Sequence, residues 1–285
     1  MTFMGYVQLL KLRIGITIAL TAVMGYAAVA KEISLNQMGL LVLAMFLGSA
    51  SSSVFNHFYD RDIDRMMKRT ANRPLASGAM ARPRMALVMA AALMVAGVGM
   101  AGFIFNWAVA LHLFLGAFFY GVVYTVWLKR RTWLNIVIGG AAGSFAVLAG
   151  AAAVDPSIWL LPWLLALTLF LWTPSHFWSL AILLKEDYNR AGVPMLPCVV
   201  GDEKAAKYIF INSLLLVGST LLPFAFGELG WLYFVGAVAF GAHFLWLNWN
   251  LLSEPTHAWA RRNFLGSMQY LVGLFLAVML DKHLL

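Results

Sequence analysis

Cysteine and charge are what this sequence has least of. It contains a single cysteine, Cys198, among 285 residues. One cysteine excludes an intramolecular disulfide and a metal site built from a cysteine cluster. Charged residues make up only 11% of the chain, while apolar residues reach 62% and the mean hydropathy is +0.81. Because soluble domains are about 45–50% apolar, we expect an integral membrane protein.

Long apolar runs fill most of the chain. A helix needs about 20 mainly apolar residues to cross a membrane, and nine such runs can be distinguished. The first run lacks the small-residue exit of a cleaved signal peptide, and we expect no cleavage there. We predict an all-α, polytopic membrane protein with nine transmembrane helices in one bundle. The predicted spans are 14–30, 39–58, 86–105, 107–127, 134–153, 158–183, 206–226, 231–252 and 264–281.

Basic residues are distributed unevenly over the connections between these spans. With a cytoplasmic N-terminus, every lysine and arginine except Lys31 and Lys282 falls on the inner side. Cytoplasmic loops carry such an excess. We therefore predict an inside N-terminus and an outside C-terminus, in the cytoplasmic (inner) membrane of a bacterium. Membrane topology accounts for the net charge of +8, so we expect no nucleic acid partner.

Two of the inside loops, 59–85 and 185–205, are much longer than the outside turns. Long loops in compact proteins are usually functional or disordered. Both loops are charged, contain helix-compatible stretches and face the same side. We see no second domain and no linker. The prediction is a single transmembrane domain over residues 1–285, with a cytoplasmic polar cap formed by these two loops.

The first long loop begins with the densest charge in the chain. Eight of the fourteen residues from Asp60 to Arg73 are charged. On a helix, Asn56, Asp60 and Asp64 recur every four residues and form one ridge. Mg²⁺ binds through one or two carboxylates together with water and phosphate oxygens, and nearby arginines can bind the same phosphates. The stretch favours a Mg²⁺–diphosphate site. The alternative is a solvated loop whose basic residues only set the topology.

A second charged cluster lies at the inner end of the sixth predicted span. Lys185, Asp187 and Arg190 follow a strongly apolar run, and Gly192 and Pro194 then end any helix. Two acidic clusters on the same side can share Mg²⁺ around one diphosphate. Lys185 and Arg190 would then neutralise the charge on the leaving group. The alternative is again a solvated loop that sets the topology.

A histidine and two tyrosines are the other candidates. His176 lies within an apolar span, where ionisable residues are costly and usually functional. It is a candidate ligand for a haem-like substrate or a proton carrier, with hydrogen-bonded packing as the plain alternative. Tyr120 and Tyr124 precede Lys129 and Arg130 at the inner end of the fourth span, and all four could line the polar cap.

Several of these motifs together carry a family resemblance. They are Asn56-xxx-Asp60-xxx-Asp64, Arg69-Thr70-xx-Arg73-Pro74-Leu75, Lys129-Arg130-Arg131-Thr132, Thr173-Pro174-Ser175-His176-Phe177-Trp178, Lys185-Glu186-Asp187-Tyr188 and Ala191-Gly192-Val193-Pro194-Met195-Leu196-Pro197. The combination resembles the UbiA superfamily of intramembrane prenyltransferases, and within it the haem O synthase (protoheme IX farnesyltransferase) branch. Many members of the superfamily carry two aspartates four residues apart in the second motif. This sequence has Leu184 and Tyr188 there, with Asp187 beside them.

The resemblance implies that farnesyl diphosphate, haem b and water give haem O and diphosphate through a Mg²⁺-assisted farnesyl cation. Mg²⁺ is the implied cofactor, held by Asn56, Asp60 and Asp64. Membrane lipid surrounds the site, and haem-handling or terminal-oxidase assembly proteins are compatible partners. The implied catalytic residues are Asn56, Asp60, Asp64, Asp187, Lys185 and Tyr188. The implied substrate-binding residues are Arg65, Lys68, Arg69, Arg73, Lys129, Arg130, Tyr120, Tyr124, His176 and Arg190.

Three alternatives remain open at this point. A relative that prenylates an aromatic quinone precursor would share the first motif, although His176 and the Leu184–Tyr188 pair argue against it. A non-catalytic haem-binding assembly factor would need His176 but neither Asp60 nor Asp64. A transporter would carry ionisable residues at mid-depth in several spans, whereas the acidic residues here cluster at one end of the bundle.

Overall fold

The computed structural model describes residues 3–284, and over that range it consists of helices and their connections. Nine helical segments in this range are long and apolar enough to cross a membrane, which confirms the predicted number. They are α2 (Leu12–Val29), α3 (Leu35–Tyr59), α5 (Met85–Ile104), α6 with the π-helix η1 (Trp107–Phe118 and Phe119–Leu128), α7 with α8 (Asn135–Gly139 and Ala141–Val154), α9 (Leu160–Leu183), α12 with α13 (Asp202–Ser219 and Leu222–Ala225), α14 (Trp231–Ser253) and α15 (His257–Leu284). The shorter helices outside them are α1 (Phe3–Leu9), α4 (Arg61–Met66), α10 (Lys185–Arg190) and α11 (Leu196–Val200).

Three of the spans, α3, α12 and α15, begin at least four residues earlier than hydropathy alone predicts. α12 starts at Asp202, directly after Gly201, whose φ of 81° allows the sharp entry into the helix. α15 starts at His257 because Thr256 Oγ1 accepts the Trp259 N–H at 3.3 Å at the helix start. Such polar first turns carry little hydropathy signal, so the apolar pattern detects only the later part of each helix.

Small residues let the helices of the bundle approach one another closely. α2 and α8 cross where Gly25 faces Val147 and Gly150 faces Ala22, and a Cβ on either glycine would overlap the facing backbone carbonyl. Membrane helices commonly pack through such positions. One apolar cluster joins α2, α3, α5, α6 and α8, and another joins α2, α8 and α9 with α12, α14 and α15. Because α2 and α8 contribute to both clusters, these two helices join the two halves of the bundle.

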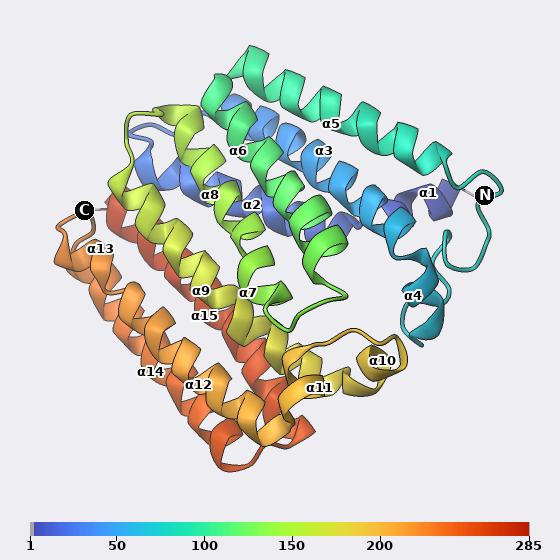
Figure 1. Ribbon diagram of the computed structural model, residues 1–285. Helices are drawn as coiled ribbons and strands as arrows, with labels where there is room; N and C mark the ends of the chain where they lie inside the picture. Colours follow the sequence, from blue (N-terminus) through green and yellow to red (C-terminus); the bar gives the residue numbers. More distant parts are fainter. Residues whose placement is uncertain (1–2, 285) are drawn as a thin grey trace.

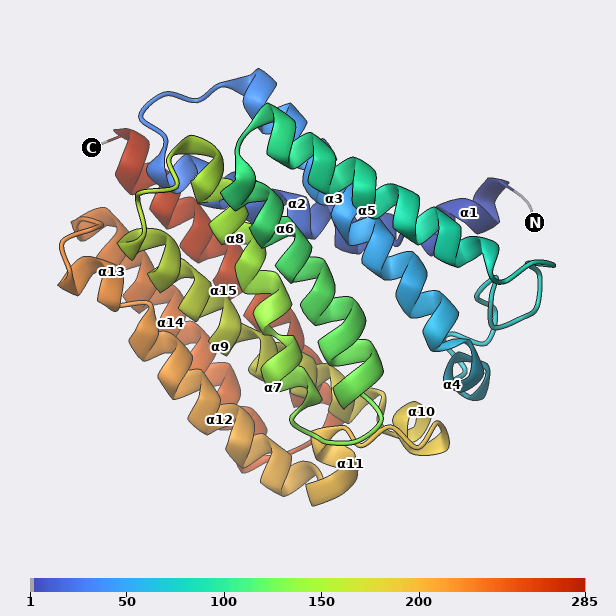
Figure 2. The same cartoon turned by 45° about the horizontal axis from the view of Figure 1, so that its top comes forward.

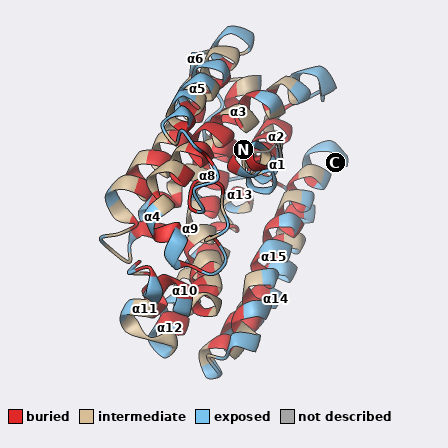
Figure 3. Ribbon diagram, turned by 90° about the vertical axis from the view of Figure 1, so that its right-hand side faces the viewer, coloured by how far each residue is buried: buried red, intermediate tan, exposed pale blue. Residues whose placement is uncertain are grey.

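The outer surface of the bundle is apolar, as the membrane assignment requires. Figure 3 shows buried residues on the inner sides of the helices and exposed residues on the outer sides. The exposed side chains include large apolar groups such as Phe103 and Val95 on α5, which are 94% and 73% exposed. Lipid tails would cover these side chains, since they are as apolar as the side chains themselves.

Polar short helices gather at one end of the bundle. Figures 1 and 2 show α4, α10 and α11 at the same end as the described N-terminal part, with the C-terminal end of α15 at the opposite end. The two long loops of the sequence therefore lie together. α4 and the loop after it come from the first, and α10 and α11 come from the second.

Candidate active site

The site is built on a ridge at the polar end of α3, formed by Asn56, Asp60 and Asp64. α3 ends at Tyr59 and α4 begins at Arg61, with Asp60 between them. Hydrogen bonds four residues apart continue through this break. The Asp60 N–H donates to the Asn56 carbonyl at 2.9 Å, and the Asp64 N–H to the Asp60 carbonyl at 2.8 Å. The predicted ridge is therefore present, and its three residues are at most 2% exposed.

Asp60 lies at the centre of a cluster of basic side chains. Its Oδ2 is 2.5 Å from Lys129 Nζ and 2.7 Å from Asn56 Nδ2, and its Oδ1 is 3.5 Å from Arg130 Nη2. Arg130 also binds both carboxylate oxygens of Asp62 at 2.7 Å, which lowers the pKa of Asp62. Removing a carboxylate from water costs several kcal/mol unless it is paired. The basic residues supply that pairing and can also meet an anionic ligand.

Asp64 is paired on one side only. Its Oδ2 is 2.8 Å from Arg73 Nη1, whereas its Oδ1 is buried without a hydrogen-bond partner in residues 3–284. Thr70 Oγ1 donates to the Asp64 carbonyl at 2.8 Å and ties the following loop to this residue. Buried polar atoms in native proteins nearly always have a partner. Asp64 Oδ1 is therefore an open position for a ligand.

Lys11 reaches the ridge from the turn between α1 and α2. Its Nζ donates to Asn56 Oδ1 at 2.8 Å and to the Tyr120 hydroxyl at 3.0 Å. Burial, together with the nearby Arg73 and Lys129, lowers the pKa of Lys11 to about 7. The sequence pattern assigned Lys11 only to topology and missed this position. No local signal marks it, because its partners lie 45 and 109 residues away.

The π-helix η1 brings three further side chains to the ridge. Hydrogen bonds in η1 run five residues apart, as from the Lys129 N–H to the Tyr124 carbonyl at 2.8 Å. Lys129 Nζ thereby lies 5.9 Å from the centre of the Tyr124 ring, and Thr125 Oγ1 accepts from Asn56 Nδ2 at 3.0 Å. Tyr120 stacks on Tyr124 with ring centres 5.8 Å apart. π-Helical turns are frequent at functional sites, and hydropathy alone predicted only a regular span here.

The second charged cluster holds the first loop in place. Asp187 Oδ1 and Oδ2 accept the backbone N–H groups of Lys68 at 3.0 Å and Arg69 at 3.3 Å. Arg190 Nη2 is 3.6 Å from Asp187 Oδ1. Burial raises the pKa of Tyr188, whose hydroxyl accepts from Arg69 Nη2 at 3.4 Å. α10 therefore ties the loop after α4 to the end of α9.

Other basic residues of the predicted site have partners elsewhere at the polar end. Lys185 Nζ is 2.9 Å from Asp202 Oδ1, at the start of α12. Arg65 Nε donates to the Ala76 carbonyl at 2.5 Å and so braces the loop after α4. The Lys68 side chain is exposed. The structure thus brings together Lys129, Arg130 and Arg73 at the ridge, and it directs Lys185 and Arg65 to structural contacts.

His176 is packed between aromatic rings of α9 and α15. Its ring lies 4.2 Å from the centre of Trp172 and 4.5 Å from that of Phe264, nearly parallel to both. His176 Nδ1 and Ser267 Oγ are 2.7 Å apart. These contacts occupy Nδ1, and Nε2 is the nitrogen through which His176 would meet a ligand.

A polar pocket of about 320 Å³ opens beside the ridge, between α1, the end of α3 and the loop after α4. His57 in its wall is 2% exposed, and neither of its ring nitrogens has a hydrogen-bond partner in the described part of the chain. Arg73 links the pocket to Asp64. Clefts lined by positive charge attract anions, and His57 can offer a further hydrogen bond. The lining residues are Gln8, Lys11, His57, Arg69, Asn72 and Arg73.

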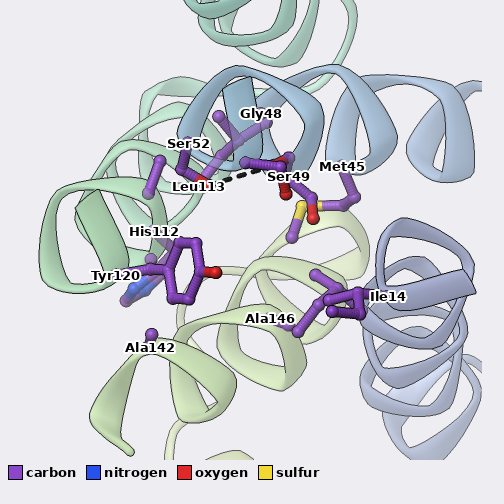
Figure 4. Close-up of a pocket in the computed structure, with 14 residues that line it drawn as sticks. Ile14, Met45, Gly48, Ser49, Ser52, His112, Leu113, Tyr120, Ala142 and Ala146 are labelled. Carbon is purple, nitrogen blue, oxygen red and sulfur yellow. Dashed lines mark hydrogen bonds between the residues drawn. The ribbon is translucent and has the colours of Figure 1, made fainter. Parts of the chain in front are cut away.

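A mainly apolar slot lies between α2, α3, α6 and α8, and Tyr120 of η1 also lines it. Figure 4 shows Tyr120 with its hydroxyl pointing into the slot, Leu113 beside Gly48, and Ile14 across from them. The slot has a volume of about 80 Å³, which is room for a few water molecules.

The ridge fits Mg²⁺ that is shared with a phosphate ligand. Asn56, Asp60 and Asp64 offer oxygen atoms, the ligands that Mg²⁺ prefers. Within residues 3–284, no three His, Cys, Asp or Glu side chains come together as a metal-binding group. An ion here would complete its shell with water and phosphate oxygens, as Mg²⁺ commonly does. The unpaired Asp64 Oδ1 is consistent with that arrangement.

Comparisons with known proteins agree along almost the whole chain. The model of the UbiA prenyltransferase family matches residues 16–277. Protoheme IX farnesyltransferase 1 of Paramagnetospirillum magneticum is 60% identical over 284 residues, which cover 99% of this chain and 100% of that protein. Protoheme IX farnesyltransferase 1 of Cenarchaeum symbiosum is 45% identical over 241 residues, or 85% of this chain and 81% of that protein.

Solved structures share the fold at low sequence identity. A structure of digeranylgeranylglyceryl phosphate synthase superimposes with a TM-score of 0.82 at 22% identity, covering 99% of this chain and 98% of that one. A UbiA homologue from Archaeoglobus fulgidus bound to DMAPP and Mg²⁺ gives a TM-score of 0.74 at 19% identity, covering 96% and 99%. At these identities, the structural likeness concerns the fold.

Proposed function

This chain belongs to the UbiA prenyltransferase family, and we propose that it transfers a farnesyl group from farnesyl diphosphate to haem b. The observation that carries the choice of substrates is the 60% identity to a protoheme IX farnesyltransferase over the full length of both chains. The polar end of the bundle supports the same chemistry, because two buried carboxylates lie there among cations.

The proposed reaction adds farnesyl and hydroxyl groups across a haem vinyl group. The bond between farnesyl C1 and the diphosphate oxygen breaks, and its electron pair leaves with the diphosphate. The vinyl π electrons form the new carbon–carbon bond to C1. Water adds to the cation left on the vinyl carbon, and its proton goes to the diphosphate or to solvent. The products are haem O and diphosphate, and the chain supplies no covalent nucleophile.

Ionisation of the diphosphate is the step that the charged residues assist. Asn56, Asp60 and Asp64 would hold Mg²⁺, which neutralises charge on the leaving diphosphate when bound. Arg73 and Lys11 line the adjoining polar pocket and would bind the diphosphate oxygens directly. Preorganised cations are most effective in a site with little water, and the ridge is at most 2% exposed.

Aromatic rings at the ridge would stabilise the farnesyl cation. Tyr120, which lines the apolar slot, stacks on Tyr124, and Lys129 Nζ lies 5.9 Å from the centre of the Tyr124 ring. The face of an aromatic ring attracts a cation, and an enclosed site keeps water from reaching it early. The two rings therefore suit a cation that must survive until the haem vinyl group attacks.

Haem would meet the polar end and α9. Lys68 and Arg69 have exposed side chains near the site and are candidates to bind the propionates. His176 would contact the haem through Nε2. The N-terminus inside and the site on the cytoplasmic side of a bacterial inner membrane complete the proposal. Haem-handling or oxidase assembly proteins would then be natural partners.

The proposal is tested by turnover of the purified chain in detergent with haem b, farnesyl diphosphate and Mg²⁺. We expect a farnesylated, hydrated haem by mass spectrometry, and its loss in EDTA. If haem stays unmodified while 4-hydroxybenzoate is prenylated, the acceptor is an aromatic quinone precursor instead. If neither acceptor reacts while a control enzyme works, a non-catalytic haem-binding role becomes the better explanation.

A further inference from the structure

A groove of about 420 Å³ lies between α1, the end of the first long loop and the first turns of α5. It is larger than the polar pocket beside the ridge, which measures about 320 Å³. Figures 1 and 2 show α1 beside the polar end of α5, at the edge of the bundle. The groove shares no lining residue with the polar pocket or the apolar slot, so it is a separate feature of the surface.

The wall that α5 gives to the groove is apolar and follows one side of the helix. Met85, Val88, Met89 and Ala92 line it at three- and four-residue steps, which place them on one face. Along the helix this wall extends about 10 Å. Met85 and Val88 are 50% and 60% exposed, and flexible methionines adapt to irregular apolar ligands. Such a wall suits an acyl chain that runs from the polar end into the membrane.

A cation without a partner in the protein stands at the polar end of this wall. Arg82 lines the groove just before α5 and is exposed, and its guanidinium has no hydrogen bond or ion pair within residues 3–284. Arg84 is also exposed. The sequence has no aspartate or glutamate in residues 1–31 or 65–154, which include every element of the groove. The walls of the groove therefore cannot neutralise this positive charge themselves.

We propose that the groove binds one anionic phospholipid, with its phosphate at Arg82 and an acyl chain along α5. Basic pockets beside membrane helices bind anionic head groups, and here the apolar wall continues from the cation into a membrane span. Tyr6 on α1 lines the opposite side, where its hydroxyl can donate to a head-group oxygen. A soluble anion would leave the apolar wall uncovered, and a zwitterionic lipid would bring its own cation close to Arg82.

A lipid in the groove would also hold α1 in place. Tyr6 and Gln8 are two residues apart and so point to nearly opposite sides of α1. Tyr6 lines the groove, whereas Gln8 lines the polar pocket. α1 therefore lies between the two hollows, and Lys11 follows it in the turn before α2. Filling the groove would restrict the movement of α1 away from α5.

The test titrates the purified full chain in a neutral detergent with dioleoylphosphatidylglycerol or dioleoylphosphatidylcholine, and native mass spectrometry counts the bound lipid. We expect one phosphatidylglycerol to bind about fivefold more tightly than phosphatidylcholine, the gain expected from one basic residue near an anionic head group. Arg82→Gln should lower this preference to about twofold or less. Equal binding of the two lipids by the wild type, or an unchanged preference in Arg82→Gln, overturns the proposal.

Arg13→Gln is the matched control for the charge, because Arg13 is an exposed arginine in the first turn of α2 and lies outside the groove. It should keep the preference of the wild type. An equal loss of preference in Arg13→Gln and Arg82→Gln would show that net charge alone attracts the lipid, and it would also overturn the proposal.

Val88→Trp tests the apolar wall without changing any charge. The larger side chain would occupy the groove, so phosphatidylglycerol should bind about tenfold more weakly or worse. Val95→Trp is the control, because Val95 lies one heptad further along α5, is 73% exposed and does not line the groove. Equal lipid affinities in these two variants would place the lipid elsewhere and overturn the proposal.

Hydrogen exchange in lipid nanodiscs tests the contact with α1. In phosphatidylglycerol nanodiscs, amide exchange in residues 3–9 of the wild type should be at least about threefold slower than in phosphatidylcholine nanodiscs. Arg82→Gln should not show this difference, and its absence in the wild type would contradict a lipid between α1 and α5. These measurements use neither haem nor farnesyl diphosphate, so their outcome is independent of the proposed reaction.

Discussion

The polar ends of α3 and α9 look alike in the sequence and differ in the structure. Each is an apolar helix that runs into a short charged helix, α4 or α10, at the same end of the bundle. At α3, Asp60 and Asp64 are buried against basic side chains. At α9, Asp187 accepts two backbone N–H groups of the first loop, and Lys185 pairs with Asp202. We therefore propose that the end of α3 binds the charged ligand and that the end of α9 holds the loop after α4 in position.

Residue spacing accounts for this difference. Carboxylates four residues apart lie on one side of a helix and repel each other unless a cation offsets them. Asp60 and Asp64 have this spacing, so each needs its own basic partner or a metal. Glu186 and Asp187 are adjacent and diverge, and in the structure Glu186 is exposed while Asp187 is buried. A single buried carboxylate can be satisfied by backbone N–H groups, and Asp187 accepts those of Lys68 and Arg69.

The variant Asp60→Asn tests most directly whether the polar end of α3 is catalytic. The amide keeps the shape but removes the charge that the ridge would use to hold Mg²⁺, so we expect kcat/KM to fall by about 10³ or more. Asp62→Asn is the control, because Asp62 is exposed and its ion pair in residues 3–284 is with the partly exposed Arg130. Its activity should stay within about fivefold of the wild type. Full turnover of folded Asp60→Asn and Asp64→Asn would rule out a catalytic ridge.

Asp187→Asn should have a smaller effect of a different kind. The asparagine amide group cannot accept both backbone N–H groups of Lys68 and Arg69, so the loop after α4 loosens. We expect KM for farnesyl diphosphate to rise about tenfold, the effect of losing one or two buried hydrogen bonds. The rate constant kcat should change by less than about threefold. A loss of kcat comparable to that of Asp60→Asn would instead place Asp187 among the groups that act on the substrate.

Local patterns in the sequence were sufficient for the nine spans and for the ridge. Apolar runs of membrane length predict the helices one by one, and a four-residue spacing predicts that Asn56, Asp60 and Asp64 share a side. Both features depend only on neighbours along the chain. The ridge even survives the break between α3 and α4, because its backbone hydrogen bonds continue.

Long-range contacts could not be predicted in this way. Lys11 next to the first span looks like a topology signal, and only the folded bundle brings it to Asn56 and Tyr120. The i→i+5 bonding of η1 also escapes hydropathy, which is the same for a regular helix. Asp187 likewise accepts hydrogen bonds from backbone groups 118 and 119 residues away, and local sequence patterns do not predict such contacts.

At the polar end of α3, the variant His57→Phe separates the effect of His57 on ligand affinity from its effect on the free energy of unfolding. Both ring nitrogens of His57 are buried without a partner in the described residues, beside Lys11 and Arg73 in the polar pocket. Replacing a buried, unpaired polar group by an apolar ring should raise the free energy of unfolding by about 1 kcal/mol. If His57 donates to the diphosphate, the affinity for farnesyl diphosphate should fall by about fivefold. A thermal melt and a binding titration of the same sample measure both effects.

His57→Gln is the matched variant for that experiment, because it keeps a hydrogen-bond donor on a side chain of similar length. It should recover part of the lost affinity. If the His57→Phe and His57→Gln variants bind farnesyl diphosphate as tightly as the wild type does, then His57 is only a packing residue. The diphosphate would then be bound in the polar pocket by Lys11, Arg69 and Arg73.

Lys185→Ala should have the smallest effect on activity and stability. This variant changes the polar end of α9 and leaves the ridge on α3 intact. Lys185 and Asp202 pair at 2.9 Å with side chains 31% and 28% exposed, and such partly exposed pairs contribute about 0–1 kcal/mol. We expect turnover within about twofold of the wild type and almost no change in melting temperature. Lys129→Ala is the contrasting lysine, since its Nζ is buried against Asp60 and its loss leaves that carboxylate without its nearest cation. If the two variants lose activity equally, α10 takes part in binding the diphosphate and the contrast between the ends of α3 and α9 disappears.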